Sequence, residues 1–314
     1  MLRNIIVIVT LVLVAILPFV TREHRAQVPS GVKIIRNLSY MPAEAEKDPL
    51  RELDLFLPRL KYGKSMPVIV WIHGGGWIEG DKNDSPALEL ARQGFATASI
   101  NYRLAPEATF PAQIRDCKRA IAWIRKHGPE YGIDPDRIGV WGLSSGGHLA
   151  ALLATTSGTK LFEEDLPASE KGSTAISACC DWSGPTDLIN FREQCPPDAV
   201  YSTFQPADLV DRLLGGPVQE NEALAREASP ITYASENCPP ILIMHAAEDP
   251  IVPFIQSQEF ANRLKGLGAP VKMIKVNSDD HVIFNSGTFE TVTDFFAEEL
   301  KSKSPAANQS QNQI

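Results

Sequence analysis

The stretch Asp134–Gly147, DPDRIGVWGLSSGG, decides the fold of this chain. An Asp-Pro-Asp turn introduces the apolar run Arg137–Trp141, and the small-residue run Ser145–Thr155 follows it. A strand, a sharp turn and a helix are therefore expected in immediate succession. The turn itself reads GLSSG at 142–146, which is a G-x-S-x-G motif in the strand–turn–helix setting that it requires.

The central serine of this turn is the candidate nucleophile. We expect Ser144 to project its hydroxyl over the sheet edge at the start of the helix. Gly142 and Gly146 are expected because the backbone on both sides of the serine comes close to its neighbours, where a Cβ would clash. Two alternatives stay open. Ser144 is only the N-cap of the helix, or Ser145 is the nucleophile, although the motif places Ser145 one residue too late.

A glycine-rich loop precedes this turn along the chain. Trp71–Trp77, WIHGGGW, directly follows an apolar run that is rich in β-branched residues. Consecutive glycines let backbone N–H groups point into a site, where they can stabilise an oxyanion. We expect Gly75, Gly76 and Ser145 to supply these donors and His73 to brace the loop. The alternative is a merely flexible glycine turn.

A serine hydroxyl needs an adjacent base, and histidine is the usual one because it titrates near neutral pH. On folds with this turn, the order along the chain is serine, acid, histidine. His281 follows the expected strand Val271–Val276 and precedes the last helix, so it is the candidate base. Asp249 lies in the loop after the expected strand Ile241–His245, so it is the candidate acid.

Other acids and histidines compete for these two roles. Glu248 is the local rival of the candidate acid. The aspartates at 279–280 are too close to His281 in sequence to reach its far nitrogen easily. His245 precedes any late acid, so its order is wrong, and His148 is expected to pack inside the helix that follows the serine.

Strands alternate with helices along the chain, which predicts an α/β protein with a mostly parallel sheet. The expected strands are Val32–Leu38, Glu52–Leu57, Val68–Ile72, Ala96–Tyr102, Arg137–Trp141, Ala175–Cys180, Ile241–His245 and Val271–Val276. The expected helices are Phe110–His127, which Gly128 ends, Ser145–Thr155, Pro206–Leu214, Phe254–Leu267 and Thr288–Lys301.

The domain organisation follows from this alternation. Residues 30–301 are expected to form a single domain, within which the long, Pro-rich segment 184–237 breaks the rhythm. Such an insertion usually sits over the carboxyl ends of the strands, where ligands bind, so we interpret it as a cap. The tail 302–314 is rich in Ser, Asn, Gln and Ala and is expected to be disordered.

The N-terminus has the sequence pattern of an export signal. Arg3 precedes the apolar run Ile5–Val20, and charged residues close it at 22–25. These 16 residues are long for the apolar core of a signal peptide, ~7–15, and short for a spanning helix of ~20. We expect residues 1–26 to be a cleaved signal peptide of a periplasmic or secreted protein. A membrane anchor through residues 5–20 and a buried core helix are the alternatives.

Composition excludes several classes of protein. Of 314 residues, 44% are apolar, which suffices for one large core without a metal or disulfide. The net charge of −8 and the absence of a long basic run argue against a nucleic-acid partner. Five cysteines and six scattered histidines form no recognisable metal motif. We expect Cys117, Cys179 and Cys180 to be buried thiols. Cys195 and Cys238 are candidates for pairing if the chain is exported.

With these residues placed, the chain resembles α/β-hydrolase carboxylesterases of the hormone-sensitive-lipase-like and feruloyl/acetyl-xylan-esterase-like groups. The resemblance covers Leu50–Phe296, and its motifs fall in the right order. They read HGGGW at 73–77, YRLAPE at 102–107, DPDRIGVWGLSSGG at 134–147, GPTDL at 184–188 and DPIVP at 249–253, before the late His281. This chain departs from the pattern at Ser145, where alanine is common, and lacks the glycines often found before the acid and after the histidine.

The resemblance implies an α/β-hydrolase fold and a serine carboxylic-ester hydrolase that acts without a cofactor. The implied substrates are small-molecule or saccharide esters with short-chain acyl or glycan-linked groups. Two alternatives remain. One is an amide-cleaving hydrolase of the same fold, a peptidase or formamidase. The other is a catalytically silent binding module, against which the complete serine, aspartate and histidine set argues.

Overall fold

The computed structural model of the chain describes residues 31–301 except 60–64, 198 and 200–203. The expectations for residues 1–26 and 302–314 therefore lie outside the described residues. Within the described ranges, the structure contains no helix that is long and apolar enough to span a membrane.

A central sheet of eight strands organises the described part of the chain, in the order β1-β2-β4-β3-β5-β6-β7-β8. β2 pairs antiparallel with β1 and β4, and all the other neighbours are parallel, which confirms the expected mostly parallel sheet. The strands are β1 (Val32–Ser39), β2 (Glu52–Pro58), β3 (Met66–Ile72), β4 (Ala96–Ile100), β5 (Ile133–Leu143), β6 (Ala178–Trp182), β7 (Ile241–Ala246) and β8 (Val271–Val276).

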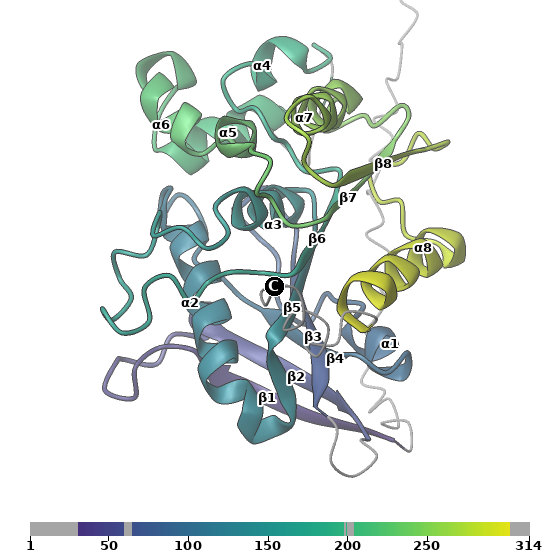
Figure 1. Cartoon of the computed structure of the whole chain (residues 1–314). Coiled ribbons are helices and arrows are strands. Elements are labelled where there is room, and N and C mark those ends of the chain that lie inside the picture. The colour runs from purple at the N-terminus through teal and green to yellow at the C-terminus, as the bar shows by residue number, and fades with distance from the viewer. Residues whose placement is uncertain (1–30, 60–64, 198, 200–203, 302–314) are drawn as a thin grey trace, which may run out of the picture.

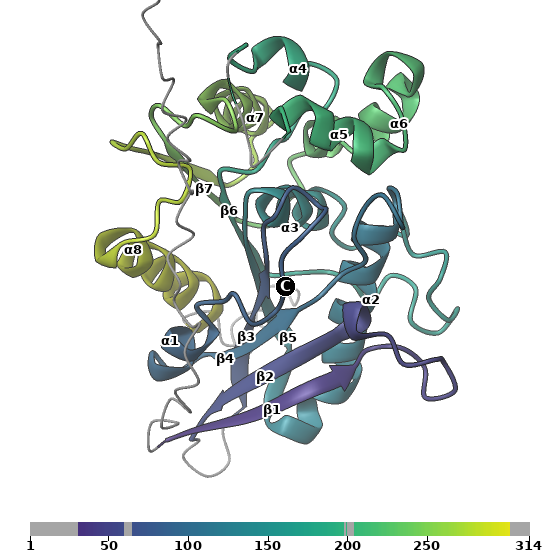
Figure 2. The same cartoon turned by 180° about the vertical axis from the view of Figure 1, so that it is seen from behind.

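Helices cover both faces of the sheet, so the architecture has three layers (Figures 1 and 2). One face carries α2 (Ala112–His127), α3 (Ser145–Thr155) and α7 (Phe254–Gly266), which pack against the larger apolar core. The other face carries α1 (Ala87–Arg92) and α8 (Ser286–Phe296). Because both faces are covered, every residue of β3 is buried, as expected for a continuous apolar run in a parallel sheet.

The segment between β6 and β7 lies beyond α3 at one end of the sheet (Figure 1). Its helices are α4 (Phe191–Gln194), α5 (Pro206–Leu214) and α6 (Glu222–Glu227), joined by short 3₁₀ turns. The bounds of α5 are those predicted. Pro206 is tolerated in the first turn, where no N–H is needed, and Gly215 ends the helix at φ +80°. We call residues 184–237 the cap segment.

Several predicted boundaries were wrong. β5, for example, begins at Ile133 rather than at Arg137, so the Asp-Pro-Asp turn expected before it lies within the strand. α2 ends at His127 with Gly128 as its C-cap, as predicted, but it begins at Ala112 rather than Phe110, and a 3₁₀ turn follows it to Gly132, which takes φ +76°. β6 extends to Trp182 rather than ending at Cys180. The polar Asp181 is buried inside the strand, so the apolar run in the sequence stops before the strand does. α8 begins at Ser286, where Asn285 forms a capping box with the first turn.

All five cysteines are free thiols, so the pairing considered for Cys195 and Cys238 does not occur in this structure. Cys117, Cys179 and Cys180 are buried, as predicted.

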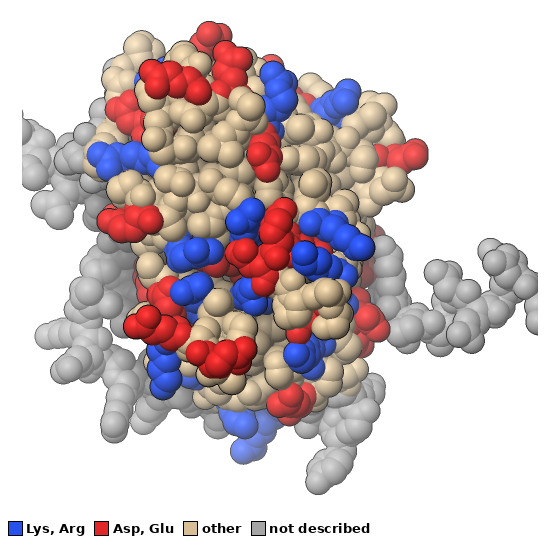
Figure 3. All heavy atoms as spheres, turned by 90° about the vertical axis from the view of Figure 1, so that its left-hand side faces the viewer, with Lys and Arg blue, Asp and Glu red and all other residues tan. Residues whose placement is uncertain are grey.

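The face that carries α2 shows interspersed charges of both signs rather than a patch of one sign (Figure 3). Ion pairs account for part of this mixture, including Arg115 with Glu164 at 3.1 Å and Lys126 with Glu170 at 2.8 Å. Such a surface has no single-sign field to attract a polyelectrolyte.

Candidate active site

The turn between β5 and α3 holds Ser144 in an uncommon backbone conformation, φ 58° and ψ −122°. A non-glycine residue in this region costs about 1–3 kcal/mol and persists only where its surroundings enforce it. The flanking glycines are part of these surroundings. A Cβ on Gly142 would lie 2.1 Å from the carbonyl oxygen of Gly146, and one on Gly146 would lie 2.1 Å from that of Ile72. The predicted need for both glycines is confirmed.

The two serines of the turn have different environments. Ser144 stands at the N-cap position of α3, but its side chain makes no capping hydrogen bond to the helix, so the alternative of a merely capping serine has no support. Its backbone N–H donates to the carbonyl of Trp182 at 2.7 Å, which anchors the turn to β6. Ser145 is 1% exposed, and its Oγ lies 3.5 Å from the hydroxyl of Tyr102. The geometry therefore presents Ser144 rather than Ser145.

The glycine loop leaves β3 directly beside this turn, because β3 and β5 are parallel neighbours with Ile72 opposite Gly142. A Cβ on Gly74 would lie 3.4 Å from the Cβ of Ser144. Gly75 and Gly76 adopt φ of +110° and +59°. Among the described residues, no acceptor is found for the backbone N–H groups of Gly75, Gly76 and Ser145, the three expected oxyanion donors.

A buried ring stack holds this loop in place. The Nδ1–H of His73 donates to the carbonyl of Gly74 at 2.8 Å, and its ring stacks on Tyr102 with centroids 4.3 Å apart. The Tyr102 hydroxyl donates in turn to the carbonyl of His73 at 3.0 Å. Burial lowers the pKa of His73 to about 4, so the ring is neutral near pH 7. The position of His73 therefore suits the expected role of holding the glycine loop in place.

The candidate acid and base meet through the loops that follow β7 and β8, two adjacent parallel strands. The Nδ1–H of His281 donates to Oδ2 of Asp249 at 2.7 Å. Oδ1 of Asp249 accepts the backbone N–H groups of Ile251 and Val252, both at 2.9 Å. Burial opposes ionisation of Asp249, but hydrogen bonding to histidines outweighs it and holds the pKa of this carboxyl below its usual range.

This arrangement leaves the other nitrogen of His281 for the serine. Nε2 of His281 is buried and has no hydrogen-bond partner among the described residues, Ser144 included. Catalytic hydrogen bonds are often long in unliganded hydrolases and close only when substrate binds. Glu248, the rival acid, has an exposed side chain, and its backbone N–H donates to the carbonyl of Ser278. The structure therefore brings together Asp249 and His281 and not Glu248.

Two further histidines support the site. His148 was expected only to pack inside α3, yet its Nδ1 accepts the indole N–H of Trp77 at 3.2 Å and its Nε2–H donates to the carbonyl of Ala228 at 2.7 Å. It thus ties the glycine loop to the cap segment. The sequence offered one signal for this role of His148, which is its place one helical turn after Ser144. His245, set aside because of its order in the chain, lies 3.2 Å from Oδ2 of Asp249.

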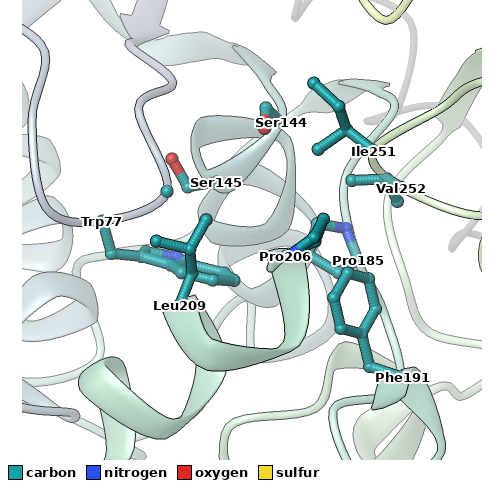
Figure 4. A pocket seen from close by; sticks show the side chains of 10 residues that line it. Trp77, Ser144, Ser145, Pro185, Phe191, Pro206, Leu209, Ile251 and Val252 are labelled. Atoms are coloured by element: carbon teal, nitrogen blue, oxygen red, sulfur yellow. The ribbon is translucent and has the colours of Figure 1, made fainter. Parts of the chain in front are cut away.

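A small apolar pocket opens beside Ser144 (Figure 4). No charged side chain lines it. The lining residues are Gly76, Trp77, Ser144, Ser145, Pro185, Phe191, Pro206, Leu209, Ile251 and Val252. The cap segment therefore supplies one wall of the pocket, and Leu209 of α5 lies against the glycine loop, since its Cδ1 would be 2.8 Å from a Cβ on Gly76.

In the described ranges, no three His, Cys, Asp or Glu residues are placed to hold a metal ion.

The order of the strands, the strained serine turn and the carboxylate–histidine pair define an α/β-hydrolase. A protein-family model, BD-FAE, matches residues 53–264. The chain belongs to the BD-FAE family of α/β-hydrolase esterases.

The relatives support this membership. "Esterase LipQ" of Mycobacterium tuberculosis is 35% identical over 215 residues, which are 68% of this chain and 49% of that protein. The chain thus spans about half the length of this curated relative. Among solved structures, a truncated carbohydrate esterase from gut microbiota is 29% identical, with a TM-score of 0.73 over 86% of this chain and 96% of the other. The bifunctional GH43-CE protein of Bacteroides eggerthii is 30% identical, with a TM-score of 0.75 over 85% and 35%.

Proposed function

We propose that this protein hydrolyses carboxylic esters through an acyl-enzyme formed on Ser144. The observation that carries the proposal is the convergence of three elements at one end of the sheet. These are a serine held in a strained turn, backbone N–H groups beside it that have no acceptor in the described part of the chain, and a buried histidine that is hydrogen-bonded to a carboxylate.

The mechanism follows from the roles that these groups can take. Ser144 Oγ attacks the acyl carbon while Nε2 of His281 takes its proton, and the N–H groups of Gly75, Gly76 and Ser145 stabilise the oxyanion. His281 then protonates the leaving alcohol, and water repeats the sequence to release the acid. Asp249 fixes the Nδ1–H tautomer and stabilises the imidazolium that forms.

The pocket favours a short acyl group as the substrate's acid part. It lies beside Ser144, its walls are apolar, and the enclosed space is small. A charged acyl group would lose its hydration there without gaining a partner. We therefore propose acetyl to butyryl esters as the acyl range.

For the alcohol part, we propose a saccharide. The support is similarity to the truncated carbohydrate esterase from gut microbiota and to the bifunctional GH43-CE protein.

We also propose, from the apolar run at 5–20, that residues 1–26 direct export. Mass spectrometry of the exported chain tests this proposal, since a mature chain that still begins at Met1 or Leu2 would contradict cleavage.

A substrate series tests the proposed activity. Purified protein is assayed with p-nitrophenyl esters of increasing acyl length, with acetylated and feruloylated glycans, and with matched anilides. We expect hydrolysis of short esters and of acetylated glycan, with anilides far slower, and no activity in Ser144→Ala. Faster cleavage of anilides than of esters would instead indicate an amidase. No turnover of any of these substrates would contradict the proposal.

A further inference from the structure

His245 lies at the carboxyl end of β7, entirely buried, with both ring nitrogens in use. Its Nε2 is 2.9 Å from the carbonyl oxygen of Val252 and 3.2 Å from Oδ2 of Asp249. Its Nδ1 is 2.7 Å from Oγ of Ser257, a buried residue of α7. These contacts join a strand, a helix and the loop that carries the candidate acid.

The acceptors determine the tautomer of His245. A carbonyl and a carboxylate only accept hydrogen bonds, so the proton must reside on Nε2, and the hydroxyl of Ser257 then donates to Nδ1. The Nε2–H is directed at Val252 and at the same time flanks Asp249. His245 is therefore not a rival base, because neither nitrogen is free and no part of its ring is exposed.

The turn from Asp249 to Val252 is closed on itself, because Oδ1 of Asp249 accepts the N–H groups of Ile251 and Val252. These bonds shape the turn but do not attach it to the sheet. His245 attaches the turn to the sheet at both ends of the turn, because its Nε2 contacts Oδ2 of Asp249 and the carbonyl of Val252. His245 is itself a residue of β7, which is a rigid element because a parallel strand pairs with it on each side.

We propose that His245 is a positioning residue that fixes the Asp249 turn to β7 and directs Oδ2 toward His281 before substrate binds. This inference rests on the proposed function, in which Asp249 orients His281. The contribution is preorganisation, since a carboxylate held by the strand does not depend on the β8–α8 loop for its place.

Three substitutions test this proposal. His245→Phe keeps a flat aromatic ring, somewhat larger than imidazole, and removes both nitrogens. His245→Gln places an N–H near the position of Nε2. His245→Asn is the matched control, because its shorter amide can contact Ser257 but does not reach the turn. Each variant is assayed for kcat and KM with p-nitrophenyl acetate, for thermal unfolding, and for the downfield proton NMR signal of the His281 Nδ1–H, which the His281→Ala variant identifies by its loss.

We expect kcat to fall about 100-fold in the Phe and Asn variants, with KM little changed, because the orienting group is displaced. The His281 proton signal should weaken or move upfield in both variants. The Gln variant should retain the signal and most of the turnover. Phe and Asn variants with reduced thermal stability but normal kcat and an unchanged signal would overturn the proposal and leave His245 as a core residue.

Two measurements keep the test decisive. Should the Phe or Asn variant fail to fold, Ser257→Ala leaves the ring in place but removes the hydrogen bond that holds its Nδ1 to α7. The proposal then expects a smaller fall in kcat with a shifted proton signal, and a normal kcat with an unshifted signal contradicts it. Because the signal needs no substrate, it tests the positioning role even if the wild-type protein hydrolyses no ester.

Discussion

Oδ2 of Asp249 accepts the Nδ1–H of His281 at 2.7 Å, although the two residues are 32 positions apart in the chain. The contact forms because β7 and β8 are parallel neighbours, so that the loops after them leave the same edge of the sheet. The other oxygen of Asp249 is held by its own turn. The carboxylate is thus constrained on both sides before any substrate is present.

Asp249→Asn should reduce kcat by about 10⁴-fold, because an amide favours the wrong tautomer of His281. Glu248→Gln should stay within about tenfold of wild type, since the Glu248 side chain is exposed and the structure gives it no contact with His281. Steady-state kinetics of the two variants with one short ester checks this. The opposite ranking would transfer the acid role to Glu248.

Ser144→Ala and His281→Ala should each lower kcat by several orders of magnitude with the fold intact, and the double variant should be little worse than either. The losses do not add because the two groups act on the same proton. Circular dichroism and single-turnover kinetics provide the measurement. If Ser144→Ala retains wild-type activity while Ser145→Ala abolishes it, the assignment of the nucleophile is wrong.

Leu209→Ala should extend the acyl range, because this side chain limits the pocket beside Gly76. Each buried CH₂ contributes about 0.8 kcal/mol, so room for about two more CH₂ groups should raise kcat/KM for hexanoate relative to acetate about tenfold. Val210→Ala is the matched control, since Val210 is buried on the same helix but does not line the pocket. An unchanged chain-length profile in Leu209→Ala would show that another residue sets the limit.

Asp181→Asn should alter the dependence of stability on pH. Burial raises the pKa of Asp181 to about 7, so the stability that it contributes is present below its unfolded pKa near 4 and is lost as pH rises through 7. Asparagine does not titrate, and its Oδ1 can keep the bond from the N–H of Gly184. The unfolding free energy of the variant relative to wild type should therefore increase by a few kcal/mol between pH 4 and pH 8. Denaturant titrations at the two pH values measure this, and parallel pH profiles would contradict it.

How far the sequence could predict the structure depends on the range of the interaction. The turn at Ser144 could be predicted because its glycines, its strand and its helix are contiguous in the sequence. α5 was readable from Pro206 and Gly215, which mark its ends. The short helices α1, α4 and α6 were missed because four to six residues hold too little periodicity.

The supporting residues of the site could not be predicted in the same way. His245 was set aside on chain order alone, and that reasoning addresses only the role of the base. Its contact with Asp249 depends on how the loop folds back over the end of β7. Likewise, the bonds from His148 to Trp77 and to Ala228 join residues 71 and 80 positions apart.

The sequence by itself determined the strand–turn–helix at Ser144, the positive φ angles open to the glycine loop and the alternation of strands and helices. Each is a property of consecutive residues, because steric limits and hydrophobic period act locally. Only the tertiary structure decided which oxygen of Asp249 faces His281, that His245 fixes the turn, and that Leu209 closes the pocket. These contacts depend on the order and register of the strands and on the path of the cap segment, which result from packing of the whole chain.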